Sequence, residues 1–198
     1  MLYEPAEKLQ FAYFPNGGLV SLIVATKDGR SVETGLFGRE GVAGLAVAVG
    51  FERSPLREVV QMSSEGFKIA VGPLQSVLRS APSLQTLLSH RAALQGLQAS
   101  QIAACNRLHN VVQRLARWLL MAKDRVDSER MQITHDFLAT MLGTDRPTVS
   151  LAASQLQKKC CIEYVRGGVR ILSRKRLENA ACECYGVLKQ WNGELGLE

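Results

Sequence analysis

The feature that most constrains this 198-residue sequence is a change of pattern near its middle. From Pro82 to about Arg125 there is no further proline and a single glycine, Gly96, which indicates one long helix. Before Gly72-Pro73, short β-rich runs alternate with turn sequences, which is typical of antiparallel strands. The chain therefore combines a β domain with a long helix that follows it.

The β part contains five predicted strands separated by turn chemistry. Asp28-Gly29 favours a tight hairpin and Pro15-Asn16-Gly17-Gly18 a second turn. The glycine-rich segment 38–55 indicates a compact loop with a short helix. Met1 is followed at once by strand-like residues, so we expect that an upstream element is missing or that the start codon lies late. The strands are expected at residues 11–14, 19–26, 31–37, 59–62 and 67–71.

The long helix carries apolar residues at intervals of three and four, which is the pattern of a helix that packs along another helix. The same pattern could instead cover the β domain of its own chain. We favour pairing with a second copy, because the stripe is longer than a small barrel could cover. This expected dimer seam consists of Leu94, Leu97, Gln101, Ala104, Leu108, Val111, Leu115, Trp118 and Ala122.

After a charged segment, Lys123 to Arg130, that we interpret as a hinge, two helical patterns follow: Asp136 to Leu142 and Arg146 to Lys159. The connection Gly143-Thr144-Asp145 makes a helix-turn-helix. Thr134 and Asp145 are suited to cap the two helices. Pro147 falls in the first turn of the second helix, where its missing N–H has no intrahelical partner.

Two alternating runs, Ile162 to Arg166 and Val169 to Leu172, flank Gly167-Gly168 and predict a β-hairpin wing. The formal net charge of +6 is concentrated between Arg146 and Arg176, where the sequence has eight basic residues and one acid, Glu163. Such a surface attracts phosphates, and a helix in the major groove contacts base edges. The alternative is a solvated face of an ordinary three-helix domain. The basic residues are Arg146, Lys158, Lys159, Arg166, Arg170, Arg174, Lys175 and Arg176.

Ile133-Thr134, the run from Leu142 to Ser150, Leu156, Ile162 and the basic hairpin resemble the carboxyl-terminal domain of the Crp/Fnr superfamily. The resemblance implies an α+β fold: an antiparallel, jelly-roll-like β-roll (1–81), a long dimerisation helix (82–126) and a winged helix-turn-helix (127–198). It also implies a cytoplasmic bacterial transcription regulator that is not an enzyme. Its expected partners are double-stranded DNA with a palindromic operator, a second copy of itself, RNA polymerase and, where the β-roll senses one, a small effector.

The resemblance places Arg146 where the family contacts a guanine. Pro147 and Leu151 stand where the prototype has glutamate and a second arginine, so we expect a different operator. The wing residue Arg166 and the helix-start residue Thr134 correspond to phosphate contacts. The residues expected to contact DNA are Thr134, His135, Arg146, Thr148, Ser150, Gln155, Lys158, Lys159, Arg166 and Arg170.

In the β domain, Gly41-Val42-Ala43-Gly44-Leu45 and Arg53-Ser54 resemble the family's cyclic-nucleotide pocket. The glutamate that accepts from the ribose is Val42 here, which costs about 1–3 kcal/mol for an unpaired hydroxyl. We therefore do not expect cyclic AMP, and another anion, another small molecule or no ligand stay open. The expected pocket residues are Gly41, Val42, Gly44, Leu45, Arg53 and Ser54.

Several other functions lack a sequence signal. Five cysteines without a CxxC pair and three scattered histidines predict buried structural thiols and neither a metal nor a haem site. Gly41 to Phe51 is too short and glycine-broken to span a membrane. No nucleophile elbow or phosphate loop is present, which argues against an enzyme that uses the Gly38 to Ser54 loop. The remaining alternative is a non-DNA interaction module whose basic face docks an acidic protein.

Overall fold

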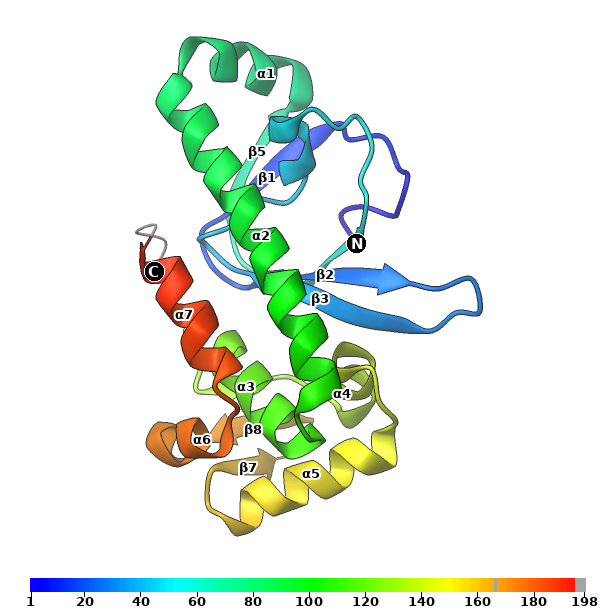
Figure 1. Cartoon of the computed structure of the whole chain (residues 1–198), viewed down its shortest axis with the longest axis vertical. Helices are drawn as coiled ribbons and strands as arrows, with labels where there is room; N and C mark the ends of the chain where they lie inside the picture. Colours follow the sequence, from blue (N-terminus) through cyan, green and yellow to red (C-terminus); the bar gives the residue numbers. More distant parts are fainter. Residues whose placement is uncertain (166, 195–198) are drawn as a thin grey trace.

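The computed structural model describes residues 1–165 and 167–194. Its amino-terminal part is an open β-roll of five antiparallel strands (Figure 1). One sheet has the order β3-β2-β4 and a second pairs β1 with β5. All five strands lie where the sequence predicts them. They are β1 (Phe11–Pro15), β2 (Leu19–Ala25), β3 (Ser31–Phe37), β4 (Arg57–Met62) and β5 (Gly66–Ala70).

The glycine-rich loop contains the expected short helix, η1 (Leu45–Val49). Gly44 before it and Gly50 after it have φ of 75° and 92°, a backbone region that favours glycine. The Tyr13–Ala43 bridge ties the loop to β1, and buried Leu45 and Val47 anchor η1 in the core beside Leu74 of the following helix.

Three helices follow in place of the single one expected. The sequence pattern does not predict α1 (Val71–Ser80), because Gly72-Pro73 indicates a change of structure there. Pro73 lies in the first turn of α1, where proline is tolerated. α2 (Pro82–Leu108) runs along the molecule, and α3 (Val111–Lys123) begins after a break (Figure 1).

The prediction of one unbroken helix is wrong because Asn110 starts a new one. Its side chain accepts a hydrogen bond from the Gln113 backbone N–H, and the Gln113 side chain accepts one from the Asn110 N–H. This reciprocal capping box satisfies backbone donors that a continuous helix would have bonded internally. Four expected seam residues are therefore on α3, where Leu115, Trp118 and Ala122 are fully buried inside their own chain and Val111 is partly buried.

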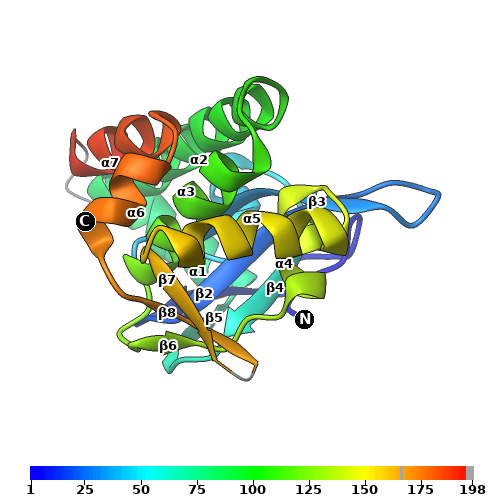
Figure 2. The same ribbon diagram turned by 90° about the horizontal axis from the view of Figure 1, so that it is seen from below.

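The carboxyl-terminal part is a winged helix-turn-helix that lies below the β-roll in Figure 1 and in front of it in Figure 2, which is seen from below. α3 lies against α5 and α6, and α7 lies beside α2. One continuous core joins the two parts, since Leu19 and Leu36 of the β-roll belong to the same buried cluster as Trp118. The elements are β6 (Arg130–Met131), α4 (His135–Leu142), α5 (Arg146–Lys158), β7 (Ile162–Val165), β8 (Gly168–Ile171), α6 (Arg174–Ala180) and α7 (Cys184–Glu194).

The expected hinge between Lys123 and Arg130 is non-helical from Asp124, and its ends are tied down. Lys123 Nζ donates to the Ser128 carbonyl over 2.9 Å, and Ser128 Oγ donates to the Arg130 carbonyl over 2.7 Å. In the described part of the chain, no helix combines the length and the apolar character that crossing a membrane requires.

Candidate nucleic-acid interface

The helix-turn-helix consists of α4 and α5, joined by Gly143 in a left-handed conformation (φ 59°). Both predicted caps are present. Thr134 Oγ1 accepts from the Phe137 N–H over 3.2 Å, and Asp145 Oδ1 accepts from the Thr148 N–H over 2.7 Å. The hydrogen bond from Thr148 lowers the pKa of Asp145. The capping carboxylate thus accepts a hydrogen bond from one of the backbone amides at the start of α5 that have no partner within the helix.

Arg146 occupies the exposed first turn of α5. Its side chain is 65% exposed, and Nη1 lies 3.6 Å from the Asp136 carboxylate, which is itself 69% exposed. An ion pair so open to water contributes little stability. The guanidinium can therefore exchange this contact for a ligand at small cost.

Four side chains, three from α5 and one from the residue that follows it, line one open groove beside the start of α3. The groove measures about 520 Å³ and is closed on the other side by Asn110 and its neighbours. Three of the four were expected to contact DNA, and the fourth, Leu151, is 63% exposed and stands where the prototype has a second arginine. The four are Thr148, Leu151, Gln155 and Lys159.

Ser150 and His135 lie in contact with each other. Ser150 Oγ donates to the Arg146 carbonyl, and it lies 2.8 Å from His135 Nδ1. Burial, reinforced by the nearby Arg146 charge, lowers the pKa of His135, so the ring is neutral at pH 7. The His135 ring also packs edge-on against Tyr164 of β7. This contact joins α4, α5 and the wing.

The remaining expected contacts differ in how freely they face solvent. Lys158 and Lys159 are exposed at the end of α5, whereas Arg170 forms an ion pair with Glu163 over 2.7 Å. Arg174, part of the same basic run, binds Asp124 over 2.7 Å. Arg166 lies outside the described residues.

The carboxyl group of Glu58 lies among the residues of the expected effector pocket. Glu58 is not one of the pocket residues that the sequence predicts. The Gly44 N–H donates to Glu58 Oε2 over 3.0 Å, and Ser54 Oγ lies 3.5 Å from Oε1. Burial raises the pKa of Glu58 to about 7, and the hydrogen bond from Gly44 counteracts part of that effect. The Gly44 amide is thus bonded to a carboxyl group of this chain, and the Ser54 hydroxyl donates to the Leu56 carbonyl over 2.7 Å.

The other residues of that region do not converge on a ligand position. Arg53 is exposed and donates to the Ala6 carbonyl over 2.8 Å. Val42 and Leu45 belong to the apolar core, and a Cβ on Gly41 would lie 2.3 Å from the Phe37 ring. The structure therefore brings Gly44 and Ser54 together and turns Arg53 away.

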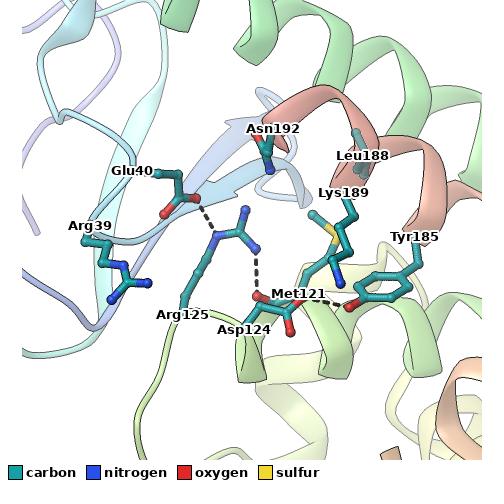
Figure 3. Close-up of a pocket in the computed structure, with 9 residues that line it drawn as sticks. All are labelled: Arg39, Glu40, Met121, Asp124, Arg125, Tyr185, Leu188, Lys189 and Asn192. Atoms are coloured by element: carbon teal, nitrogen blue, oxygen red, sulfur yellow. Dashed lines mark hydrogen bonds and ion pairs between the residues drawn. The ribbon is translucent and has the colours of Figure 1, made fainter. Parts of the chain in front are cut away.

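A small cavity of about 170 Å³ lies between the β-roll, α3 and α7 (Figure 3). Arg125 points across it and donates from Nε to Glu40 over 2.6 Å, while Tyr185 donates to Asp124 over 2.9 Å. Burial alone would raise the pKa of Glu40, but the charges of Arg125 and Arg91 lower it overall. A buried ion pair therefore joins the hinge to the β-roll.

Four of the five cysteines are buried, as the sequence predicts for structural thiols, and Cys160 is exposed. Cys105, Cys182 and Cys184 gather with His109, and their ligand atoms all lie within 4.8 Å of one another. Sequence spacing hid this group, because more than 70 residues separate its two halves. The available signal was Cys105-x-x-x-His109, which puts both side chains on one face of a helix.

Comparisons with known proteins agree with this architecture. Residues 113–180 match the Crp-like helix-turn-helix domain. FixK2 from Bradyrhizobium japonicum is 19% identical, with 91% of this chain and 92% of that chain covered and a TM-score of 0.78. TTHA1359, a Crp/Fnr-family transcriptional regulator from Thermus thermophilus, is 22% identical over 91% and 93% of the two chains, with a TM-score of 0.72. The search of curated proteins finds no match.

Proposed function

We propose that this chain, which has the Crp/Fnr fold and a Crp-like helix-turn-helix domain, is a DNA-binding transcription regulator that contacts its operator through α5. The observation that carries the proposal is the position of Arg146. It stands exposed in the first turn of a helix capped by Asp145, and its ion pair with Asp136 is long and open to water. An arginine so placed can donate two hydrogen bonds to a guanine in the major groove.

The side chains that line the groove beside α5 extend the proposed recognition surface beyond Arg146. Gln155 can pair with an adenine, and exposed Leu151 offers an apolar contact for a thymine methyl group. Lys158, Lys159 and Thr134 supply phosphate contacts that orient the helix. The operator then combines a guanine contact with positions that differ from the prototype's.

We propose that α2 forms the dimer contact. Leu97 is 48% exposed and Leu108 74% exposed, and both lie on one face of the helix with exposed Ala104. Of the other expected seam residues on α2, Leu94 is buried and Gln101 donates to Cys184 of the same chain. A two-fold dimer along this face would present two α5 helices to half-sites of a palindrome.

An effector, if bound in the β-roll, is unlike a cyclic nucleotide. A phosphate would meet the Glu58 carboxyl group at the Gly44 amide and the Ser54 hydroxyl. The β-roll can still influence α5, because the Arg125–Glu40 ion pair and the shared core couple the two parts. We propose that a shift in this contact changes the affinity for DNA.

The experiment is selection of duplexes from a random library by the full chain, followed by titration of the selected sequence at several salt concentrations. The proposal predicts a recovered palindrome and an affinity that falls steeply with salt as counterions are released. An acidic-protein docking module would recover no preferred duplex. That result would contradict DNA recognition.

A further inference from the structure

The clustered cysteines lie where three helices meet. Cys105 and His109 are one helical turn apart at the end of α2, and Cys182 and Cys184 flank the start of α7. Cys105 Sγ lies 3.4 Å from Cys182 Sγ, and Cys184 Sγ lies 3.7 Å from His109 Nδ1. The three cysteines are buried and His109 is partly buried.

This set of atoms has the composition and the spacing of a closed metal site. Three thiolates and one imidazole are a common structural zinc set, with Zn–S of about 2.3 Å and Zn–N of about 2.0 Å in tetrahedral geometry. Ligand atoms on such a tetrahedron are roughly 3.5 Å apart. The observed separations of 3.4 and 3.7 Å are close to that value.

Neighbouring side chains are placed as outer partners of a metal site. His109 Nε2 lies 3.2 Å from a carboxylate oxygen of Glu183, while Nδ1 faces the thiols. Gln101 Nε2 donates to Cys184 Sγ over 3.1 Å. A carboxylate behind a histidine ligand sets its tautomer and ring orientation, and an N–H donor to sulfur stabilises a thiolate.

Buried positive charge lies near the cluster, which suits a site that carries a net negative charge. Arg117 is 2% exposed, and its Nε has no hydrogen-bond partner among the described residues; the same holds for Nε of Arg114. The Arg117 charge acts on the Cys105 sulfur and favours an anionic group there. Three thiolates with one divalent ion carry a net negative charge, which buried guanidinium groups compensate.

We propose that Cys105, His109, Cys182 and Cys184 bind one zinc ion, which fastens the start of α7 to the junction of α2 and α3. All four positions are filled by protein ligands, so the ion is structural. Because α3 packs against α5, the ion stabilises the base on which the recognition helix rests. Metal content can be measured without DNA, so a negative result for zinc binding is distinct from a negative result for the proposed regulator function.

The first experiment measures the metal content of the full chain purified under reducing conditions, and then the absorption spectrum after exchange with Co²⁺. We expect about one zinc per chain and the intense visible bands of tetrahedral, thiolate-bound Co²⁺. Cys184→Ser should lower metal content at least tenfold. Cys160→Ser is the matched control, because Cys160 is exposed and outside the cluster, and it should retain the ion.

A second variant keeps the test decisive if Cys184→Ser fails to fold. His109→Cys replaces one zinc ligand by another, so it should retain the ion and intensify the sulfur-to-cobalt absorption. Wild-type protein without bound metal and without these Co²⁺ bands would overturn the proposal. A Cys105–Cys182 disulfide as the main form in freshly purified protein, detected by mass spectrometry, would overturn it as well.

Discussion

Trp118 donates its indole N–H to the Glu33 carboxyl group over 2.8 Å, which links α3 of the helix-turn-helix part to β3 of the β-roll. Ser21 Oγ donates to the other oxygen of Glu33, and all three side chains are buried. Burial raises the pKa of Glu33 to about 7, despite these hydrogen bonds and the Arg117 charge. The two parts are thus joined by a polar contact inside a shared apolar core.

Replacing Trp118 by Phe should destabilise the chain. The substitution removes the indole N–H and leaves a buried acceptor with one donor fewer, at a cost of roughly 1–3 kcal/mol. Urea unfolding followed by circular dichroism measures the effect. Trp191→Phe is the control, because Trp191 is 43% exposed near the end of α7, and it should change stability by less than about 0.5 kcal/mol. Equal stability of the two variants would contradict the role assigned to Trp118.

Replacing Glu58 by Gln should reduce the pH dependence of stability. The folded pKa of about 7 exceeds the ordinary 4.5, so the folded state binds this proton more tightly than the unfolded chain does. The stabilisation is complete below pH 4.5 and is lost as pH rises through 7, by roughly 3 kcal/mol in total. Gln can still accept a hydrogen bond from the Gly44 N–H. As pH rises from 4.5 to 7, the stability of Glu58→Gln should therefore increase relative to that of the wild type. Parallel stability curves would refute the buried carboxyl group.

Breaking the Arg125–Glu40 ion pair should cost more than removing it whole. Both side chains are under a tenth exposed, and Glu40 also pairs with buried Arg91, so Glu40→Gln leaves two buried guanidinium groups without this charge partner, which costs roughly 3–5 kcal/mol. The double variant Glu40→Gln with Arg125→Met should recover part of that loss. Chemical unfolding of the two single variants and the double variant supplies the coupling energy. Strict additivity would show that the pair is not energetically coupled.

The proposed dimer face can be tested with one charge. Leu108→Lys should give a monomer, because an ammonium buried in the contact between two α2 helices has no partner and the lost apolar burial weakens association. Light scattering during size-exclusion chromatography measures the mass. Val77→Lys on α1 is the control, since Val77 is exposed to a similar degree as Leu97 but lies off α2. A wild-type chain that is monomeric, or a Leu108→Lys variant that stays dimeric, would exclude this face.

The local features of the fold could be predicted from sequence, because strand alternation, the caps at Thr134 and Asp145, and Pro147 act over a few residues. The long helix was extended too far, since the apolar spacing of α3 continues that of α2 and hides the Asn110 capping box. Glu58 and the cysteine cluster were missed for another reason. Their partners are distant along the chain, so only the fold brings them together.

Within the proposed recognition surface, the exposure of Arg146 and of the two lysines at the end of α5 could be predicted from their positions on the helix. The Ser150–His135 contact could not, because it depends on how α4 and α5 cross. This contact changes the expectation for Ser150, whose hydroxyl is already engaged by His135 and the Arg146 carbonyl. We expect Thr148 and Gln155 to contribute more to base contacts.

The most direct test of the central claim compares Arg146→Ala with wild type on the selected operator and on operators changed at each guanine. Loss of a bidentate guanine contact costs roughly 1–3 kcal/mol, or about 5- to 150-fold in affinity, and Arg146→Ala should no longer distinguish that guanine from other bases. Arg79→Ala, on α1 at the far end of the molecule, should bind as wild type does (Figure 1). If Arg146→Ala keeps the wild-type affinity and the full guanine preference, the recognition role of α5 is contradicted.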